Sequence, residues 1–141
     1  MRIMLDTNVL ISALLFPSTG MNAMMNYIFT HNQLVLSSYV VDELKDVVKR
    51  KFPKKKSSIN KLLMIMSFEY VYTPEMIESG LFDIRDVKDY PVLYTAIIED
   101  VDILVTGDKD FSGIDIEKPE IMSPAQFTER FLRNDNNGIK Q

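Results

Sequence analysis

The sequence alternates between short apolar runs and longer amphipathic stretches, and this alternation restricts the fold more than any other feature. The runs show no apolar–polar alternation, and we expect strands at residues 2–6, 34–36, 70–72, 103–106 and 120–122. Between the runs, apolar residues recur at helical spacing. Strands separated by helices form βαβ units, and strands without alternation are covered on both faces. The pattern predicts an α/β fold with a central, mostly parallel β-sheet flanked by α-helices on both faces.

Capping residues and apolar spacing give the expected helices, at 19–30, 38–52, 57–68, 73–78, 91–99 and 124–132. Thr73 followed by Pro74 is typical of an N-cap with Pro in the first helical position. Ser123 and Gln126 have the spacing of a capping box. The stretch 91–99 is apolar on most sides, which is typical of a buried helix.

The 141 residues correspond to about one domain. We expect a single domain over 1–133 and a polar, disordered tail over 134–141. The absence of Cys excludes disulfides, thiolate metal sites and cysteine nucleophiles, and the single His31 leaves too few imidazoles for a histidine zinc centre. No apolar run approaches the roughly 20 residues of a membrane span, and no signal peptide is evident. We therefore expect a cytoplasmic protein with no membrane partner.

Charge is distributed unevenly along the chain, whose formal net charge is −4. Half of the 16 basic residues lie between positions 45 and 61, opposed only by Asp46: Lys45, Lys49, Arg50, Lys51, Lys54, Lys55, Lys56 and Lys61. Between 75 and 120 the balance reverses, with 13 acids against four basic residues. Two interpretations are open: two solvated faces, or a ridge that attracts phosphates beside an acidic pocket.

Several acids stand where chemistry is expected in a parallel sheet. Asp6 directly follows the first strand and Asp108 follows the strand 103–106, so both belong to the sheet edge where ligands bind. Asp86 and Asp89 precede the helix 91–99, and Glu43 lies within the helix 38–52. Carboxylates that converge need a cation, and oxygen ligands without imidazoles favour Mg²⁺ or Mn²⁺. Such a site can polarise a phosphodiester and acidify a water.

Each acid also has a simpler structural interpretation. Asp89 can cap its helix, and Asp6 and Asp108 can each stabilise a turn. Glu43 can be an ordinary surface residue of its helix. The combination is harder to explain in this way than its separate members.

Four short motifs in chain order carry a resemblance to a known family. They are Leu5–Asp6–Thr7–Asn8–Val9–Leu10, Asp42–Glu43–Leu44, the run from Asp89 to Ala96, and Val105–Thr106–Gly107–Asp108–Lys109–Asp110–Phe111. Each motif is weak alone, but the four are in register and span nearly the whole chain. The sequence resembles the PIN domain family, and looks closest to its bacterial and archaeal toxin-like members, including the VapC type.

This resemblance implies an activity and a set of site residues. PIN domains are Mg²⁺- or Mn²⁺-dependent nucleases that mostly act on RNA, with a three-layer arrangement of helices around a parallel sheet. The resemblance implies that the catalytic and metal-binding acids are Asp6, Glu43, Asp89 and Asp108. It implies polar neighbours at Thr7, Asn8 and Thr106, and secondary acids at Asp86 and Asp110. The run from Asp86 to Pro91 departs from the more usual Asp–Pro–Asp–Asp–Asn, so the choice between Asp86 and Asp89 as ligand stays open.

The resemblance also implies partners: many members form homodimers, and the toxin-like members pair with an antitoxin that covers the acidic groove. The resulting hypothesis is an endoribonuclease, the toxin of a toxin–antitoxin pair, which hydrolyses RNA while the cations between Lys49 and Lys56 guide the RNA backbone. One alternative is another Mg²⁺-dependent phosphoryl-transfer domain. A haloacid dehalogenase-type phosphatase needs Asp where Asn8 stands, and Asp108 comes too late for a receiver domain. A second alternative is a non-catalytic module of the same fold that binds RNA or protein.

Overall fold

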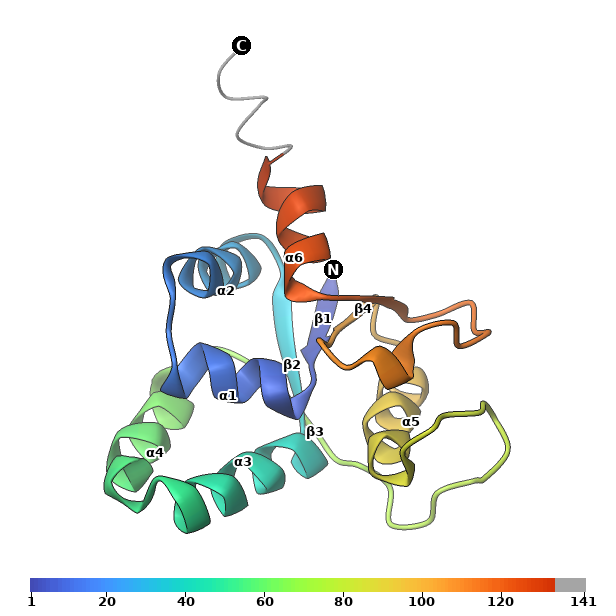
Figure 1. Cartoon of the computed structure of the whole chain (residues 1–141), viewed down its shortest axis with the longest axis horizontal. Helices are drawn as coiled ribbons and strands as arrows, with labels where there is room; N and C mark the ends of the chain where they lie inside the picture. Colours follow the sequence, from blue (N-terminus) through green and yellow to red (C-terminus); the bar gives the residue numbers. More distant parts are fainter. Residues whose placement is uncertain (134–141) are drawn as a thin grey trace.

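The central element is a five-stranded sheet in which every neighbouring pair of strands is parallel, in the order β3-β2-β1-β4-β5 (Figure 1). The computed structural model describes residues 1–133, and the tail predicted for 134–141 lies outside the described residues. The strands are β1 (Arg2–Leu5), β2 (Gln33–Ser37), β3 (Glu69–Val71), β4 (Ile103–Val105) and β5 (Glu120–Met122). The predicted strands and their parallel arrangement are confirmed.

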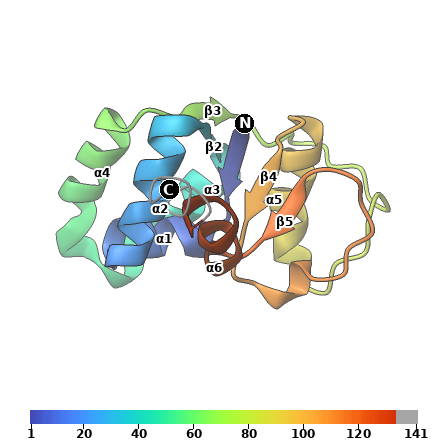
Figure 2. The same ribbon diagram turned by 90° about the horizontal axis from the view of Figure 1, so that it is seen from above.

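Helices cover both faces of this sheet. The α-helices are α1 (Thr7–Leu15), α2 (Thr19–His31), α3 (Ser38–Lys51), α4 (Lys56–Ile65), α5 (Tyr90–Ile98) and α6 (Pro124–Phe127). Short turns of other helix types complete the fold: η1 (Pro53–Lys55), η2 (Val87–Asp89), η3 (Lys109–Phe111) and the π-helical η4 (Thr128–Arg133). Seen from two directions, α5 lies on one face of the sheet and α1, α2 and α6 lie on the other (Figures 1 and 2). The predicted fold class is confirmed.

The strands are buried because apolar residues occupy successive positions on them. Ile3, Met4 and Leu5 of β1 are all fully buried, as are Val35 of β2 and Leu104 of β4. Side chains of consecutive strand residues point to opposite faces, so a strand with this composition must be covered on both sides. Among residues 1–133 no helix is long and apolar enough to span a membrane.

One predicted helix is wrong: residues 73–78 belong to a loop that continues to η2. The capping signal at Thr73 is used for tertiary contacts instead. The Thr73 N–H donates to Ser38 Oγ at 2.9 Å, and Thr73 Oγ1 accepts from Thr95 Oγ1 at 2.9 Å. The loop is also tied to α5, because the Tyr90 hydroxyl donates to the Glu78 carbonyl at 2.6 Å.

The segment 7–15, which carried no clear signal in the sequence, is α1. Its N-cap is Asp6, whose Oδ1 accepts from the Thr7 N–H at 2.7 Å. A site residue therefore also begins the helix, as the structural interpretation of Asp6 anticipated in part.

Candidate active site

Asp6 is held rigidly where β1 meets α1. The residue is only 5% exposed, and both of its carboxylate oxygens accept hydrogen bonds. Oδ1 accepts from the Thr7 backbone, and Oδ2 accepts from Thr106 Oγ1 at 2.8 Å. Thr106 follows β4, the parallel neighbour of β1, and the Asp6 N–H donates to the Val105 carbonyl at 3.0 Å. The register of the two strands thus brings Asp6 and Thr106 side by side.

The Thr106 hydroxyl also connects Asp6 to Asp108. It accepts a hydrogen bond from the Asp108 N–H at 3.1 Å, while its own proton goes to Asp6. Asp108 in turn begins η3, and its Oδ1 accepts from the Asp110 N–H at 2.9 Å. Both carboxylates predicted from the ends of β1 and β4 therefore belong to one hydrogen-bonded unit.

Glu43 reaches the same unit from α3. Thr7 Oγ1, itself buried, donates to Glu43 Oε2 at 2.6 Å. Because Thr7 is the first residue of α1, this contact joins the start of α1 to the second turn of α3. A threonine hydroxyl orients Glu43 here much as Thr106 orients Asp6.

Asp89 has no comparable support. Its Oδ2 is buried, and no hydrogen-bond partner for this atom exists among the described residues. Carboxylate oxygens of Asp86, Asp89 and Asp110 all lie within 4.8 Å of one another. The two outer members of this trio have other roles as well: Asp86 Oδ1 accepts from the Lys88 N–H at 3.0 Å, and Asp110 faces Arg85 at 3.7 Å.

The electrostatics of the site follow from burial and like charges. Burial raises the pKa of Asp6 above its ordinary value, and the charges of Asp108 and Glu43 add to this, against the hydrogen bonds from Thr106 and Thr7. The pKa of Asp89 rises to about 7, first through desolvation and then through the charge and hydrogen bonding of Asp108, followed by the charges of Asp6 and Asp86. The cluster is unfavourable when fully ionised, unless a cation offsets its charge.

Tyr39 also lies at the candidate site, although it was not among the residues predicted from the sequence. Its hydroxyl donates to the Lys88 carbonyl in η2 at 3.1 Å, and the Glu43 carboxylate lies close enough to act on its pKa. Burial and the neighbouring Glu43 raise the pKa of Tyr39 to about 12, so the phenol stays protonated. Tyr39 precedes Glu43 by four residues on α3, and this spacing, which places two side chains on one helix face, was the available signal.

The structure thus connects most of the predicted residues to one another. A chain of hydrogen bonds and close charges connects these members: Thr7, Glu43, Asp6, Thr106, Asp108, Asp89, Asp86 and Asp110. Asn8 lies exposed on α1, and within residues 1–133 no hydrogen bond joins it to these acids. The acids, which we call the acidic cluster, meet at the end of the sheet where β1 and β4 finish.

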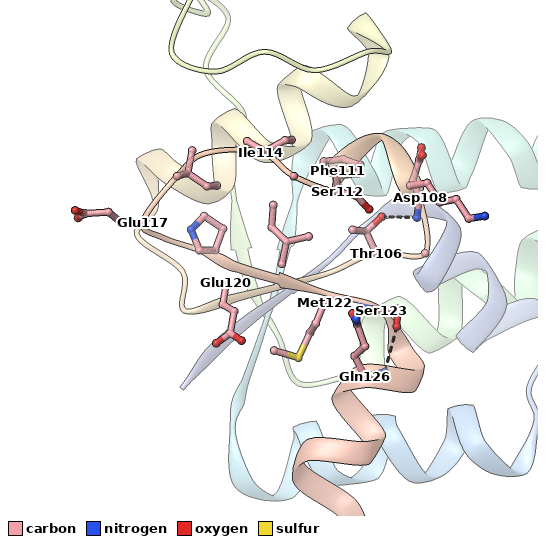
Figure 3. A pocket seen from close by; sticks show the side chains of 16 residues that line it. Thr106, Asp108, Phe111, Ser112, Ile114, Glu117, Glu120, Met122, Ser123 and Gln126 are labelled. Atoms are coloured by element: carbon pink, nitrogen blue, oxygen red, sulfur yellow. Dashed lines mark hydrogen bonds between the residues drawn. The ribbon is translucent and has the colours of Figure 1, made fainter.

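A cleft of about 730 Å³ opens beside this cluster, where Thr106 and Asp108 lie next to Ser123 and Gln126 of the α6 N-terminus and Glu117 lies on the opposite side (Figure 3). Figure 3 also shows the capping hydrogen bond between Ser123 and Gln126, which fixes the start of α6 beside the cleft. Asp6, Glu43 and Asp89 do not line the cleft. Its charged lining is mainly acidic, so a phosphate would enter it only with its charge offset.

A family model described as "PIN domain" matches residues 2–110. The chain belongs to the PIN domain family. The match covers the four principal predicted acids, and the parallel sheet agrees with the fold that the resemblance implied. No curated protein matched the sequence.

Solved structures with the same fold include chains of VapBC2, FitAcB and VapBC. A chain of VapBC2 from Rickettsia felis, solved with a DNA fragment from its promoter, is 21% identical, with 86% of this PIN domain chain and 97% of that chain covered. A chain of FitAcB from Neisseria gonorrhoeae is 20% identical, with 87% of this chain and 98% of that chain covered. A chain of DNA-bound VapBC from Salmonella typhimurium is 15% identical, with 88% of this chain and 98% of that chain covered. The TM-score is 0.65 in each case. At these identities the likeness concerns the fold.

Proposed function

We propose that this PIN domain hydrolyses phosphodiester bonds of RNA with Mg²⁺ or Mn²⁺ held by Asp6, Glu43, Asp89 and Asp108. The observation that carries the proposal is the environment of Asp89. A carboxylate oxygen is buried there without a hydrogen-bond donor, and the neighbouring charges of Asp108 and Asp6 are of the same sign. A divalent cation would satisfy the oxygen and offset the repulsion at once.

The donor set fits a hard cation. Every candidate ligand is a carboxylate oxygen, which is what Mg²⁺ and Mn²⁺ prefer, and the chain offers no thiolate. Asp86 and Asp110 would contribute from the outer side, where their oxygens already lie close to Asp89. Bound there, the ion would supply Lewis acidity to the phosphate and lower the pKa of water.

The residues of this chain would divide the remaining work. Thr106 and Thr7 keep Asp6 and Glu43 in fixed orientations, so these carboxylates need not reorganise when the substrate binds. Glu43, at the edge of the cluster, would orient the attacking water. Asn8, exposed on the first turn of α1, would contact a phosphate oxygen.

We also propose that the protein is the toxin of a toxin–antitoxin pair. Membership in the PIN domain family and the fold shared with chains of VapBC and FitAcB support this. An antitoxin segment covering the acidic cluster would then be the natural inhibitor. Homodimer formation and a cytoplasmic location remain predictions, and light scattering on the purified protein tests the first of them.

The decisive experiment compares cleavage of single-stranded RNA by the wild type, Asp6→Asn and Asp108→Asn in Mn²⁺. We expect each variant to lose at least about 100-fold in rate, since even the loss of a group that supports a ligand typically costs 10- to 100-fold. Glu129→Gln is the matched control, because Glu129 is an exposed carboxylate on η4 paired with Arg133. Cleavage by both Asn variants at the wild-type rate would overturn the proposal.

A further inference from the structure

The strongest positive charge of the molecule lies away from the acidic cluster. Residues 45–61, which we call the basic corner, comprise eight cations and one Asp, a net charge of +7 in a chain whose total is −4. They form the second half of α3, η1 and the first half of α4. In Figure 1 the basic corner lies where α3 (turquoise) meets α4 (green), on the side of the molecule away from α5.

This charge is mostly unneutralised within the protein. Arg50 pairs with Asp46 at 2.9 Å, and Lys55 is turned towards the end of α1, where it donates to the Leu15 carbonyl at 3.4 Å. Among residues 1–133, no carboxylate comes within 4.0 Å of the other six cations, and all of them are exposed. Cations this close together repel one another, so the corner gains from a multivalent anion.

The corner also has a shaped site for such an anion. A hollow of about 370 Å³ between α3 and α4 is lined by three lysines, Lys45, Lys49 and Lys56, together with Asn60 and with Asp46, whose charge is paired with Arg50. Its floor is formed by Val48 and Ile59, which are each 2% exposed and therefore rigidly packed. Flexible ammonium groups around a fixed apolar floor suit a phosphate chain, which binds lysine by charge without base-specific contacts.

One helix, α3, connects the acidic cluster to the basic corner. Glu43 and Arg50 are seven residues apart on α3, so they share a side of the helix at a separation of about 10 Å along its axis. A stacked nucleic-acid strand covers that distance with about three nucleotides, at 3.4 Å each. A strand cleaved at the acidic cluster can therefore reach the basic corner a few nucleotides away.

We infer that the basic corner binds the phosphodiester backbone of the single-stranded RNA whose adjoining segment lies at the acidic cluster. This inference rests on the proposed function for the identity of the substrate. It adds a second contact that compensates for the repulsion between RNA and the acidic remainder of the chain.

The test measures binding rather than cleavage. A labelled 12-nucleotide single-stranded RNA is titrated with the full-length protein in EDTA at 50–200 mM NaCl, followed by fluorescence anisotropy. The triple variant Lys45→Gln, Lys49→Gln, Lys56→Gln removes exposed side chains, so the fold should persist. Three lost phosphate contacts lower the slope of log K against log salt by about 2, at about 0.7 per contact on single strands. Between 50 and 200 mM the wild type should then lose about 20-fold more affinity than the variant.

The matched control is Lys118→Gln, Arg130→Gln, Arg133→Gln. It changes the net charge equally, but at cations that already pair with carboxylates, and it should bind RNA with the wild-type slope. The inference would be overturned if the triple lysine variant bound RNA with the affinity and salt slope of the wild type. An acidic protein segment would then be the better candidate ligand for the basic corner. RNA that binds through these lysines but is never cleaved in Mn²⁺ would instead overturn the proposed function alone.

Discussion

Replacing Asp89 with Asn tests directly whether the acidic cluster carries a cost that a cation relieves. Asn has nearly the same shape as Asp and no charge, so it removes the repulsion from Asp108 and Asp6 while leaving the packing in place. We expect Asp89→Asn to stabilise the metal-free protein, although most substitutions at a half-buried position destabilise.

The magnitude follows from the pKa of Asp89. Its ordinary value is 3.8 and its value in the folded protein is about 7. At 1.36 kcal/mol per pH unit, this difference is at most about 4 kcal/mol of folding free energy. Asp89 is partly exposed and shares its charge interactions with Asp108, so screening reduces the figure, and we expect about 1–2 kcal/mol.

The effect of Asp89 ionisation on the free energy of unfolding depends on pH in a defined way. Between pH 4 and pH 7 the folded chain keeps a proton on Asp89 that the unfolded chain has lost, so the wild type loses stability as pH rises through this window. Above pH 7 the whole cost is present, and near pH 4 it vanishes. The advantage of Asp89→Asn over the wild type should therefore be near zero at pH 4 and largest at pH 8.

The assay measures the free energy of unfolding in urea, in the presence of EDTA, at pH 4, 6 and 8. The control is Asp83→Asn, at an exposed loop position, whose free energy of unfolding should match that of the wild type at each pH. Mn²⁺ should then reverse the order of stability. At 100 times its Kd it would stabilise the wild type by about 2.7 kcal/mol, and it should stabilise Asp89→Asn much less. An Asp89→Asn protein no more stable than the wild type at pH 8 in EDTA would refute the reasoning.

Two further predictions concern residues that position the acids. Tyr39→Phe removes the hydrogen bond from α3 to η2, so Mn²⁺ affinity measured by calorimetry should fall by about tenfold while the fold is kept; unchanged affinity would show that Tyr39 positions nothing at the site. Thr106→Val leaves Asp6 Oδ2 and the Asp108 N–H without their partner, so the free energy of unfolding should fall by about 1–3 kcal/mol in urea. A loss below about 0.5 kcal/mol would mean that water replaces the hydroxyl.

The sequence was sufficient to predict the part of the site that depends on sheet topology. Asp6 and Asp108 follow strands that proved to be parallel neighbours, and such strands necessarily bring their carboxyl ends to one edge. Glu43 and Asp89 were candidates from their positions, and the PIN domain motifs grouped them with Asp6 and Asp108, because they stand on helical elements whose packing no periodicity reveals.

The remainder depends on long-range contacts that local patterns do not encode. The helix expected at 73–78 failed because Ser38 and Thr95, from two other elements, bind the groups that would have capped it. Tyr39 was missed for the same reason, since its partner is a backbone carbonyl 49 residues away. In both cases the partner of the polar group was determined only by the assembled fold.

The acids of the cluster differ in how many of their carboxylate oxygens accept hydrogen bonds from the protein, and this difference indicates where a cation would matter most. Asp6 and Glu43 each accept a threonine hydroxyl, so part of their charge is already satisfied by the protein. Asp89 has a buried oxygen without a donor, and it lies between those inner acids and the pair Asp86 and Asp110 on the outer turns. We therefore propose Asp89, rather than Asp86, as the acid whose charge a cation would chiefly offset. The strongest coupling between metal binding and stability should accordingly be at Asp89, with a smaller one at Asp86, whose exposed carboxylate already caps η2.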